Sequence, residues 1–146
     1  LTHIFRQIKI TKHDASKWCL YQKEHFDKIL LDAPCSGERY FMNDESEILS
    51  WTRKRSQNMS ARQFGLVASA FECLKVGGDL VYSTCSISQF ENDDVIRKLL
   101  KKRSGRVEVL KFDSPMGEAT EFGWQILPDV ASGFGPIYLS LVKRLS

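Results

Sequence analysis

Residues 29–37 read ILLDAPCSG, an apolar run that stops at an acid, a proline and a cysteine. Further along the chain, residues 80–88 read LVYSTCSIS and again lead from apolar residues to a cysteine. A continuous apolar run, rather than an alternating one, is typical of a parallel strand that is covered on both faces. The first segment therefore predicts such a strand, and the second segment predicts another strand that ends in a cysteine.

Strand and helix patterns alternate along the rest of the chain. Strands are expected at residues 5–15, 26–34, 79–85, 106–112 and 136–145, helices at residues 57–78 and 88–103, and loops at residues 36–56 and 113–135. Gly77 and Gly78 are expected to stop the first helix. Ser88, with Glu91 three residues later, forms a capping-box pattern that is expected to start the second helix. This alternation predicts an α/β protein with an open sheet.

Four reactive or acidic residues fall at the carboxyl ends of the predicted strands: Asp14, Asp32, Cys35 and Cys85. Ligands of open α/β sheets bind beyond these ends. Parallel neighbouring strands lie about 4.8 Å apart. If the second and third strands are neighbours, Cys35 and Cys85 converge on one pocket with Asp32 beside them.

The four cysteines and three histidines show no metal-binding spacing. No two of the cysteines form a C-x-x-C pair, so we expect free thiols in a reducing intracellular compartment and no metal. Cys19 and Cys73 are interpreted as small apolar side chains. Cys35 and Cys85 each enter a turn or the start of a helix, where a helix N-terminus is expected to favour the reactive thiolate.

The size and charge of the chain fit one soluble domain. It has 146 residues and a net charge of +3, and no apolar run approaches the length of a membrane span. Because it begins with Leu1 rather than Met, we expect it to be cut from a longer protein. Basic residues gather in two clusters, which suit either a phosphate backbone or a solvated helix face: Arg53, Lys54, Arg55 and Arg62, and then Arg97, Lys98, Lys101, Lys102, Arg103 and Arg106.

Several motifs together resemble one enzyme family. DAPCSG (residues 32–37) and VYSTCS (residues 81–86), which is followed by ENDDVI, are similar to the two signature blocks of the Sun/Fmu family of RNA cytosine-5 methyltransferases. HDASKW (residues 13–18) resembles the acidic motif that precedes them in the family. The tail GFGPIYLSLVKRL is similar to that of the mitochondrial-type members, which act on ribosomal or transfer RNA.

The resemblance implies a fold and a covalent mechanism. The fold would be that of Rossmann-like methyltransferases that use S-adenosylmethionine. Cys85 would attack C6 of cytosine, which makes C5 nucleophilic, and Cys35 would assist release of the methylated product. Asp32 would stabilise charge at N3 of the base. Asp14 would bind the adenine end of the cofactor, and Asp32 and Pro34 would also lie against the cofactor.

The resemblance also implies an RNA partner, ribosomal or transfer RNA, and a protein that delivers the RNA is conceivable. A looped or single-stranded substrate would let the base leave its stack. Contacts to this RNA are expected from Arg39, Arg53, Lys54, Arg55 and Arg62. The family resemblance places the protein in the mitochondrion, cytoplasm or nucleus, with no membrane partner.

The chain also departs from the family pattern. The glycine-rich cofactor loop and the central strands of the family sheet would precede Leu1, and the glycines of the chain form no G-x-G-x-x-G. We therefore expect the chain to be the C-terminal portion of one catalytic domain (residues 1–146), inactive alone and weak in cofactor binding. Three alternatives stay open: a catalytically silent RNA-binding or assembly protein, a thiol–disulfide protein that uses Cys35 and Cys85, and a DNA cytosine-5 enzyme.

Overall fold

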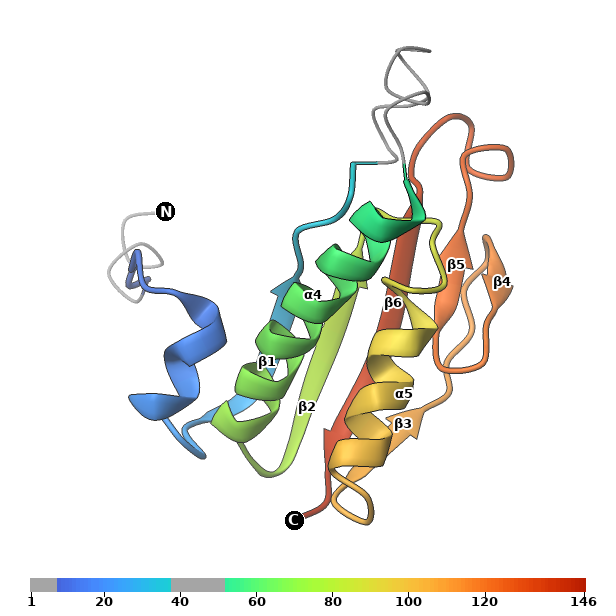
Figure 1. Ribbon diagram of the computed structural model, residues 1–146. Coiled ribbons are helices and arrows are strands. Elements are labelled where there is room, and N and C mark those ends of the chain that lie inside the picture. Colours follow the sequence, from blue (N-terminus) through green and yellow to red (C-terminus); the bar gives the residue numbers. More distant parts are fainter. Residues whose placement is uncertain (1–7, 38–51) are drawn as a thin grey trace.

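The computed structural model describes residues 8–37 and 52–146, and it shows one mixed sheet with helices on one face (Figure 1). The strand order is β1-β2-β6-β5-β4, and β3 pairs with β6 beside β5. Only β1 and β2 are parallel; the other pairs are antiparallel. The elements in chain order are η1 (Ala15–Leu20), β1 (Phe26–Asp32), α4 (Arg53–Cys73), β2 (Leu74–Thr84), α5 (Asp93–Lys102), β3 (Val107–Leu110), β4 (Glu118–Ala119), β5 (Trp124–Ile126) and β6 (Ile137–Arg144).

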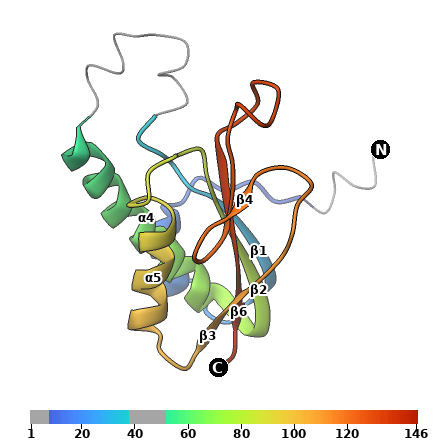
Figure 2. The same ribbon diagram turned by 90° about the vertical axis from the view of Figure 1, so that its right-hand side faces the viewer.

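The core lies between the sheet and the two long helices, which cover the same face (Figure 2). Its fully buried members include Val67 and Phe71 of α4, Leu80 of β2 and Ile96 of α5. The prediction that β1 is covered on both faces is wrong for the described residues. Leu30 is 72% exposed, because α4 covers only the opposite face of β1, and β1 stands at the edge of the sheet.

The expected strand at residues 5–15 does not form in its described part. Residues 8–14 belong to no strand, and η1 begins at Ala15. Although β1 is an edge strand, this segment does not pair with it, because it leads into η1, which is held on α4, where the Cys19 amide donates to Ser69 Oγ (3.1 Å). Residues 1–7 lie outside the described part of the chain.

The helix before β2 starts and stops elsewhere than expected. Thr52 caps α4 by accepting a hydrogen bond from the Arg55 amide (3.2 Å), and the helix ends at Cys73. Gly77 and Gly78 lie inside β2 instead. Gly77 adopts a positive φ of 84°, and a Cβ on Gly78 would lie 2.9 Å from the Asp27 carbonyl oxygen. The glycines therefore allow the irregular pairing of β1 with β2.

The buried Arg144 explains why α4 can end without a glycine. Its guanidinium donates to the Leu74 carbonyl oxygen (2.6 Å) and the Glu72 carbonyl oxygen (3.3 Å), and it pairs with Glu24 (2.6 Å). Arg144 is 2% exposed. A cation at a helix C-terminus satisfies the last carbonyl groups and complements the helix dipole.

Two further expectations are corrected in the C-terminal half. The capping box of Ser88 and Glu91 does not form, because α5 begins at Asp93 and the Glu91 side chain binds elsewhere. The expected loop at residues 113–135 contains the short strands β4 and β5. The expected strands at residues 26–34, 79–85, 106–112 and 136–145 are confirmed as β1, the end of β2, β3 and β6.

Candidate active site

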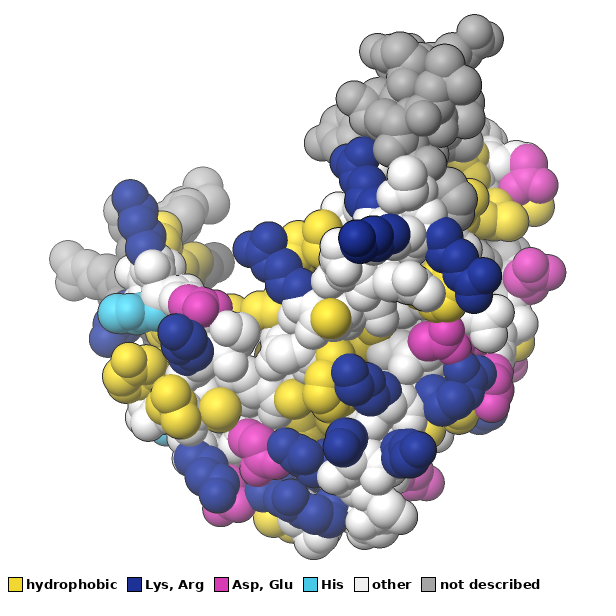
Figure 3. Space-filling view, in the orientation of Figure 1, with side chains coloured by type: hydrophobic (Ala, Val, Ile, Leu, Met, Phe, Trp, Pro, Cys, Tyr) yellow, Lys and Arg dark blue, Asp and Glu magenta, His cyan; other side chains and the backbone are white. Residues whose placement is uncertain are grey.

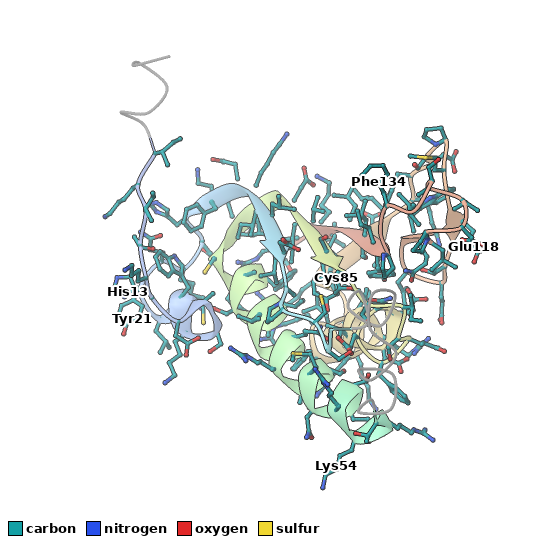
Figure 4. All side chains as sticks on the ribbon, turned by 90° about the horizontal axis from the view of Figure 1, so that it is seen from above. His13, Tyr21, Lys54, Cys85, Glu118 and Phe134 are labelled. Atoms are coloured by element: carbon teal, nitrogen blue, oxygen red, sulfur yellow. The ribbon has the colours of Figure 1, made fainter. Side chains whose placement is uncertain are left out.

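The strands β1 and β2 are parallel neighbours, so their carboxyl ends lie side by side. This is the condition under which Cys35 and Cys85 were expected to converge. Asp32 pairs with Ser83 in the parallel register, and the Ala33 amide extends the ladder by donating to the Ser83 carbonyl oxygen (2.9 Å). Two turns follow at the same edge of the sheet: the Cys35 turn, residues 33–37, and the Cys85 turn, residues 84–88. Figure 4 shows Cys85 near the middle of the molecule when it is viewed from above.

The two cysteines are in direct contact. The Cys85 backbone N–H donates to Cys35 Sγ (2.9 Å), and Cys35 Sγ donates to the Ala33 carbonyl oxygen (3.3 Å). Burial, followed by the neighbouring Cys85 side chain, raises the pKa of the Cys35 thiol to about 12. Cys35 is therefore a neutral thiol at neutral pH.

The expectation that helix N-termini activate both thiols is wrong. The pKa of Cys35 is shifted in the opposite direction, because desolvation disfavours the thiolate. For Cys85, the nearest helix starts only at Asp93, and the first turn of α5 carries Asp93 and Asp94. A helix end favours charges only within its first turn, so the helix dipole does not explain reactivity at either cysteine.

One side chain from α4 and one from the turn that precedes α5 hold the Cys35 turn. The Ser36 amide donates to Glu91 Oε2 (2.9 Å), and Gln63 Nε2 donates to the Pro34 carbonyl oxygen (2.7 Å) and to the same Glu91 oxygen (3.1 Å). Gln63 and Glu91 are both fully buried. The backbone on each side of Cys35 is thus bound to one buried pair.

The Cys85 turn is held mainly by Asn92. Thr84 Oγ1 donates to Asn92 Oδ1 (2.6 Å), and Asn92 Nδ2 donates to the Ser86 carbonyl oxygen (2.9 Å) and to Gln125 Oε1 (3.0 Å). Gln125 Nε2 also reaches the Ser86 carbonyl oxygen (3.3 Å). Sequence reasoning missed Gln63, Asn92 and Gln125, and it assigned Glu91 to a cap; the only available signal was the polar pair Glu91–Asn92 close behind the second cysteine.

The predicted acidic residues have different positions. Asp32 directly precedes the Cys35 turn, Pro34 lies within it, and both residues are exposed. Asp14 is the N-cap of η1, where Oδ1 accepts from the Ser16 amide (3.0 Å) and hydroxyl (2.7 Å), and these bonds lower the pKa of Asp14. His13, the neighbour of Asp14, lies at the left edge of the molecule in Figure 4, whereas Cys85 lies near the middle. The structure therefore brings Asp32 to the cysteines but not Asp14.

The first basic cluster lies on the N-terminal half of α4 (Figure 3). Arg53 stacks on the Phe90 ring at 5.0 Å. Lys54, Arg55 and Arg62 line an open surface hollow of about 460 Å³ together with Thr52, Asn58 and Met59. Within residues 8–37 and 52–146, Lys54, Arg55 and Arg62 form no ion pair, and they lie at the same end of the sheet as the cysteine turns (Figure 1). Arg39 lies outside the described residues.

The second basic run is largely engaged within the protein. Arg97 pairs with Asp94 and Glu121, and Arg103 pairs with Glu72 (2.7 Å). Lys98 lies 4.4 Å from the centre of the Phe64 ring. The structure thus favours the reading of this run as a solvated helix face that stabilises the fold.

The remaining candidates add little chemistry. All four cysteines are free thiols, and burial raises the pKa of Cys73 to about 11. Within residues 8–37 and 52–146, no cluster of three potential metal ligands is found. No helix in this described part combines the length and apolar character needed to cross a membrane.

Comparisons with known proteins identify the family of this chain. Residues 3–141 match the family model of the 16S rRNA methyltransferase RsmB/F. The chain belongs to the RsmB/F family. It is 46% identical over 95 residues to the ribosomal RNA small subunit methyltransferase F of Aeromonas salmonicida, an alignment that covers 65% of this chain and 20% of that protein. With the Shewanella piezotolerans protein of the same name, the identity is 34% over 142 residues, covering 94% of this chain and 30% of its relative.

A solved structure confirms the predicted fold. NSun6 from Pyrococcus horikoshii, crystallised with SFG, matches with a TM-score of 0.76 and 23% identity over 94% of this chain and 35% of that protein. The fold of this RsmB/F chain is thus part of a Rossmann-like methyltransferase fold. The chain spans only 20% to 30% of the length of these two curated relatives.

Proposed function

We propose that this RsmB/F chain carries the cysteine pair of an rRNA cytosine-5 methyltransferase that uses S-adenosylmethionine. The observation that carries the proposal is the contact of Cys85 N–H with the Sγ atom of a neutral Cys35 (2.9 Å). This contact places Cys35 and Cys85 together at the end of a parallel strand pair, where α/β enzymes bind ligands. The names of the relatives, ribosomal RNA small subunit methyltransferase F, support rRNA as the substrate.

The proposed reaction uses Cys85 as the nucleophile. The Cys85 thiolate forms a bond to C6 of cytosine, and the electron pair of the C5–C6 double bond becomes available at C5 for attack on a methyl group. S-adenosylmethionine, when bound, would supply this methyl group, with S-adenosylhomocysteine as the leaving group. A base then takes the C5 proton, the electron pair of the C5–H bond restores the C5–C6 double bond, and the C6–S bond breaks to return Cys85 as thiolate. Cys35 assists this release, and Asp32 stabilises charge at N3 of the base.

The residues present fit part of a cofactor site. Asp14 and Asp32 are exposed, and hydrogen bonds from Ser16 keep the Asp14 carboxylate charged. Such carboxylates accept hydrogen bonds from amino and hydroxyl groups, so Asp14 would hold the adenine end, and Asp32 and Pro34 the part near the methyl group. The chain has no G-x-G-x-x-G loop for the remaining contacts. We therefore expect residues 1–146 alone to bind S-adenosylmethionine weakly, which titration calorimetry would test.

The first basic cluster is proposed as the RNA contact. Lys54, Arg55 and Arg62 line one hollow on α4, and this helix also supplies Gln63 to the Cys35 turn. Phosphate groups bound there would lie on the side from which a base enters the site.

Free thiols at all four cysteines fit a reducing compartment.

The test is a covalent adduct on a denaturing gel. The full-length protein would be incubated with rRNA and S-adenosylmethionine as the Cys35→Ala, Cys85→Ala and double variants. We expect an adduct that accumulates in Cys35→Ala and disappears in the double variant, because only Cys85 forms the bond to C6. An adduct that depends on Cys35 would reverse the two roles. A protein that binds rRNA but gives no adduct and no methyl transfer would instead be the silent RNA-binding form, and labelling of tRNA or DNA alone would change the substrate class.

A further inference from the structure

Three consecutive residues before and at the start of α5 each hold a different segment of the site region. Glu91, Asn92 and Asp93 are 0%, 3% and 8% exposed. Charged and polar side chains are rarely buried unless they have specific partners. Each of the three must therefore be explained by what it binds.

Glu91 serves the Cys35 turn. Its Oε2 accepts the Ser36 amide and Gln63 Nε2, and Gln63 also binds the Pro34 carbonyl oxygen. The backbone on both sides of Cys35 is thereby fixed to the helices. The Glu91 carbonyl oxygen is itself fixed by the hydroxyl group of the buried Tyr82 (2.6 Å). The negative charge of Glu91 also contributes to the raised pKa of Cys35, after burial and the neighbouring Cys85.

Asn92 serves the Cys85 turn. It accepts from Thr84 Oγ1 (2.6 Å) and donates to the Ser86 carbonyl oxygen (2.9 Å), so it binds the residues on both sides of Cys85. Because Glu91 and Asn92 are joined by one peptide bond, the two cysteine turns are held from a single point of the backbone. This arrangement fixes the distance between the Cys85 amide and Cys35 Sγ.

Asp93 serves neither turn. Its Oδ1 accepts from Thr120 Oγ1 (2.9 Å), the Phe122 amide (3.1 Å) and the Tyr138 hydroxyl (2.7 Å), and its Oδ2 accepts the Glu121 amide (3.1 Å). These partners belong to the segment between β4 and β5 and to β6. Asp93 is therefore a neighbouring residue of comparable burial that supports the fold without touching a cysteine turn.

We propose that Glu91 and Asn92 are separate positioning residues for the two thiols: Glu91, through Gln63 and Ser36, positions Cys35 for release, and Asn92 positions Cys85 for attack. The assignment of steps rests on the function proposed above. The positioning itself rests only on the contacts of the two turns. The two parts therefore need two measurements.

The first measurement is thiol alkylation in the full-length protein without RNA or cofactor. Peptide mass spectrometry would follow iodoacetamide labelling of Cys35 and Cys85 in the Gln63→Met, Glu91→Gln, Asn92→Asp and Asp93→Asn variants. Gln63→Met is expected to speed labelling of Cys35 about tenfold, the effect of one lost buried hydrogen bond. Glu91→Gln keeps an acceptor for Ser36 but removes the charge, so it should move the pH profile of Cys35 to lower pH. Asn92→Asp should speed labelling of Cys85 several-fold, and Asp93→Asn should change neither thiol.

The second measurement is the RNA adduct in the same variants. Gln63→Met should increase the adduct by slowing release, and Glu91→Gln, which keeps an acceptor for the Ser36 amide, should increase it less. Asn92→Asp should slow adduct formation about tenfold, since it removes one hydrogen bond to the Cys85 turn. A general loss of stability would change the adduct in the same direction in both variants. An increase in Gln63→Met together with a decrease in Asn92→Asp is therefore specific to the positioning roles.

The outcomes separate the two proposals. If Gln63→Met and Asn92→Asp change both thiols equally, or no more than Asp93→Asn at a matched urea midpoint, the positioning roles are refuted. If no variant, including Cys35→Ala, gives an RNA adduct, the proposed function fails. In that case, thiol-specific labelling changes would still support the positioning.

Discussion

The two cysteine turns lie at the same edge of the sheet but are held in different ways. The Cys35 turn is fixed from distant parts of the chain: Glu91 lies 55 residues from Ser36, and Gln63 lies 29 residues from Pro34. The Cys85 turn is fixed mainly within its own segment, since Asn92 lies eight residues from Thr84 and six from Ser86. The comparison shows that the Cys35 turn depends on the assembled helices, whereas much of the support of the Cys85 turn is local.

The largest effect expected from this difference is in thiol reactivity. A pKa of about 12, against an ordinary value of 9.0, makes the Cys35 thiolate rare at pH 8. The greater nucleophilicity of a basic thiolate offsets part of this loss, so Cys35 should react about 30-fold more slowly than an unfolded cysteine peptide. Timed alkylation with mass spectrometry of the folded and urea-unfolded protein checks this. Equal rates in both states would show that the Cys35 thiol is not protected.

The second prediction concerns Gln125, a distant support of the Cys85 turn. Gln125→Leu removes the bond from Gln125 Nε2 to the Ser86 carbonyl oxygen and the acceptor of Asn92 Nδ2. We expect a loss of about 2 kcal/mol in the free energy of unfolding, because a buried donor is left without its partner. Urea denaturation measures the loss, and amide exchange should rise at Cys85 but not at Ser36. Faster exchange at Ser36 alone would contradict the separate support of the two turns.

The third prediction uses pH to test the Cys35 turn. The folded pKa of Cys35 is raised, so the folded state holds this proton more tightly than the unfolded state. The stability from this proton is present below pH 9.0 and is lost as the pH rises towards about 12. The urea midpoint should therefore fall from pH 8 to pH 11, and less so in Cys35→Ala. The pKa of Cys73 is also raised, to about 11, so the Cys73→Ala variant is measured in parallel to separate the contribution of Cys73 from that of Cys35. If the urea midpoint of Cys35→Ala falls with pH as steeply as that of the wild type, the burial argument is refuted.

The same contrast explains what the sequence could predict. The strands that end at Asp32 and at Thr84 were visible as apolar runs, and their motifs located Cys35 and Cys85. The supports of the Cys35 turn were not visible, because Gln63 reads as a polar residue on a helix and Glu91 reads as a capping residue. Their roles appear only when α4 and α5 pack on the sheet.

The expected strand before Asp14 failed for a related reason. A segment forms a strand only where it pairs with a neighbour, and residues 8–14 do not pair with the open edge of β1, because the η1 helix that follows them packs on α4. The helix end at Cys73 was also missed, because it depends on Arg144, more than 70 residues away along the chain. Local patterns thus located the strands and the motifs, whereas contacts between distant segments decided the remaining features.

The smallest expected effect concerns RNA binding on the side of the Cys35 turn, because α4 carries both Gln63 and the first basic cluster. Lys54→Ala and Arg62→Ala should each weaken RNA binding at low salt and reduce the slope of log affinity against log salt concentration by about 0.7, the value for one contact to a single-stranded phosphate. Filter binding at several salt concentrations measures this slope. Arg103→Ala is the matched control, since Arg103 is paired with Glu72 (2.7 Å) and should leave the slope unchanged. A slope that responds to Arg103 but not to Lys54 would move the RNA from α4 to α5, and therefore away from the helix that holds the Cys35 turn.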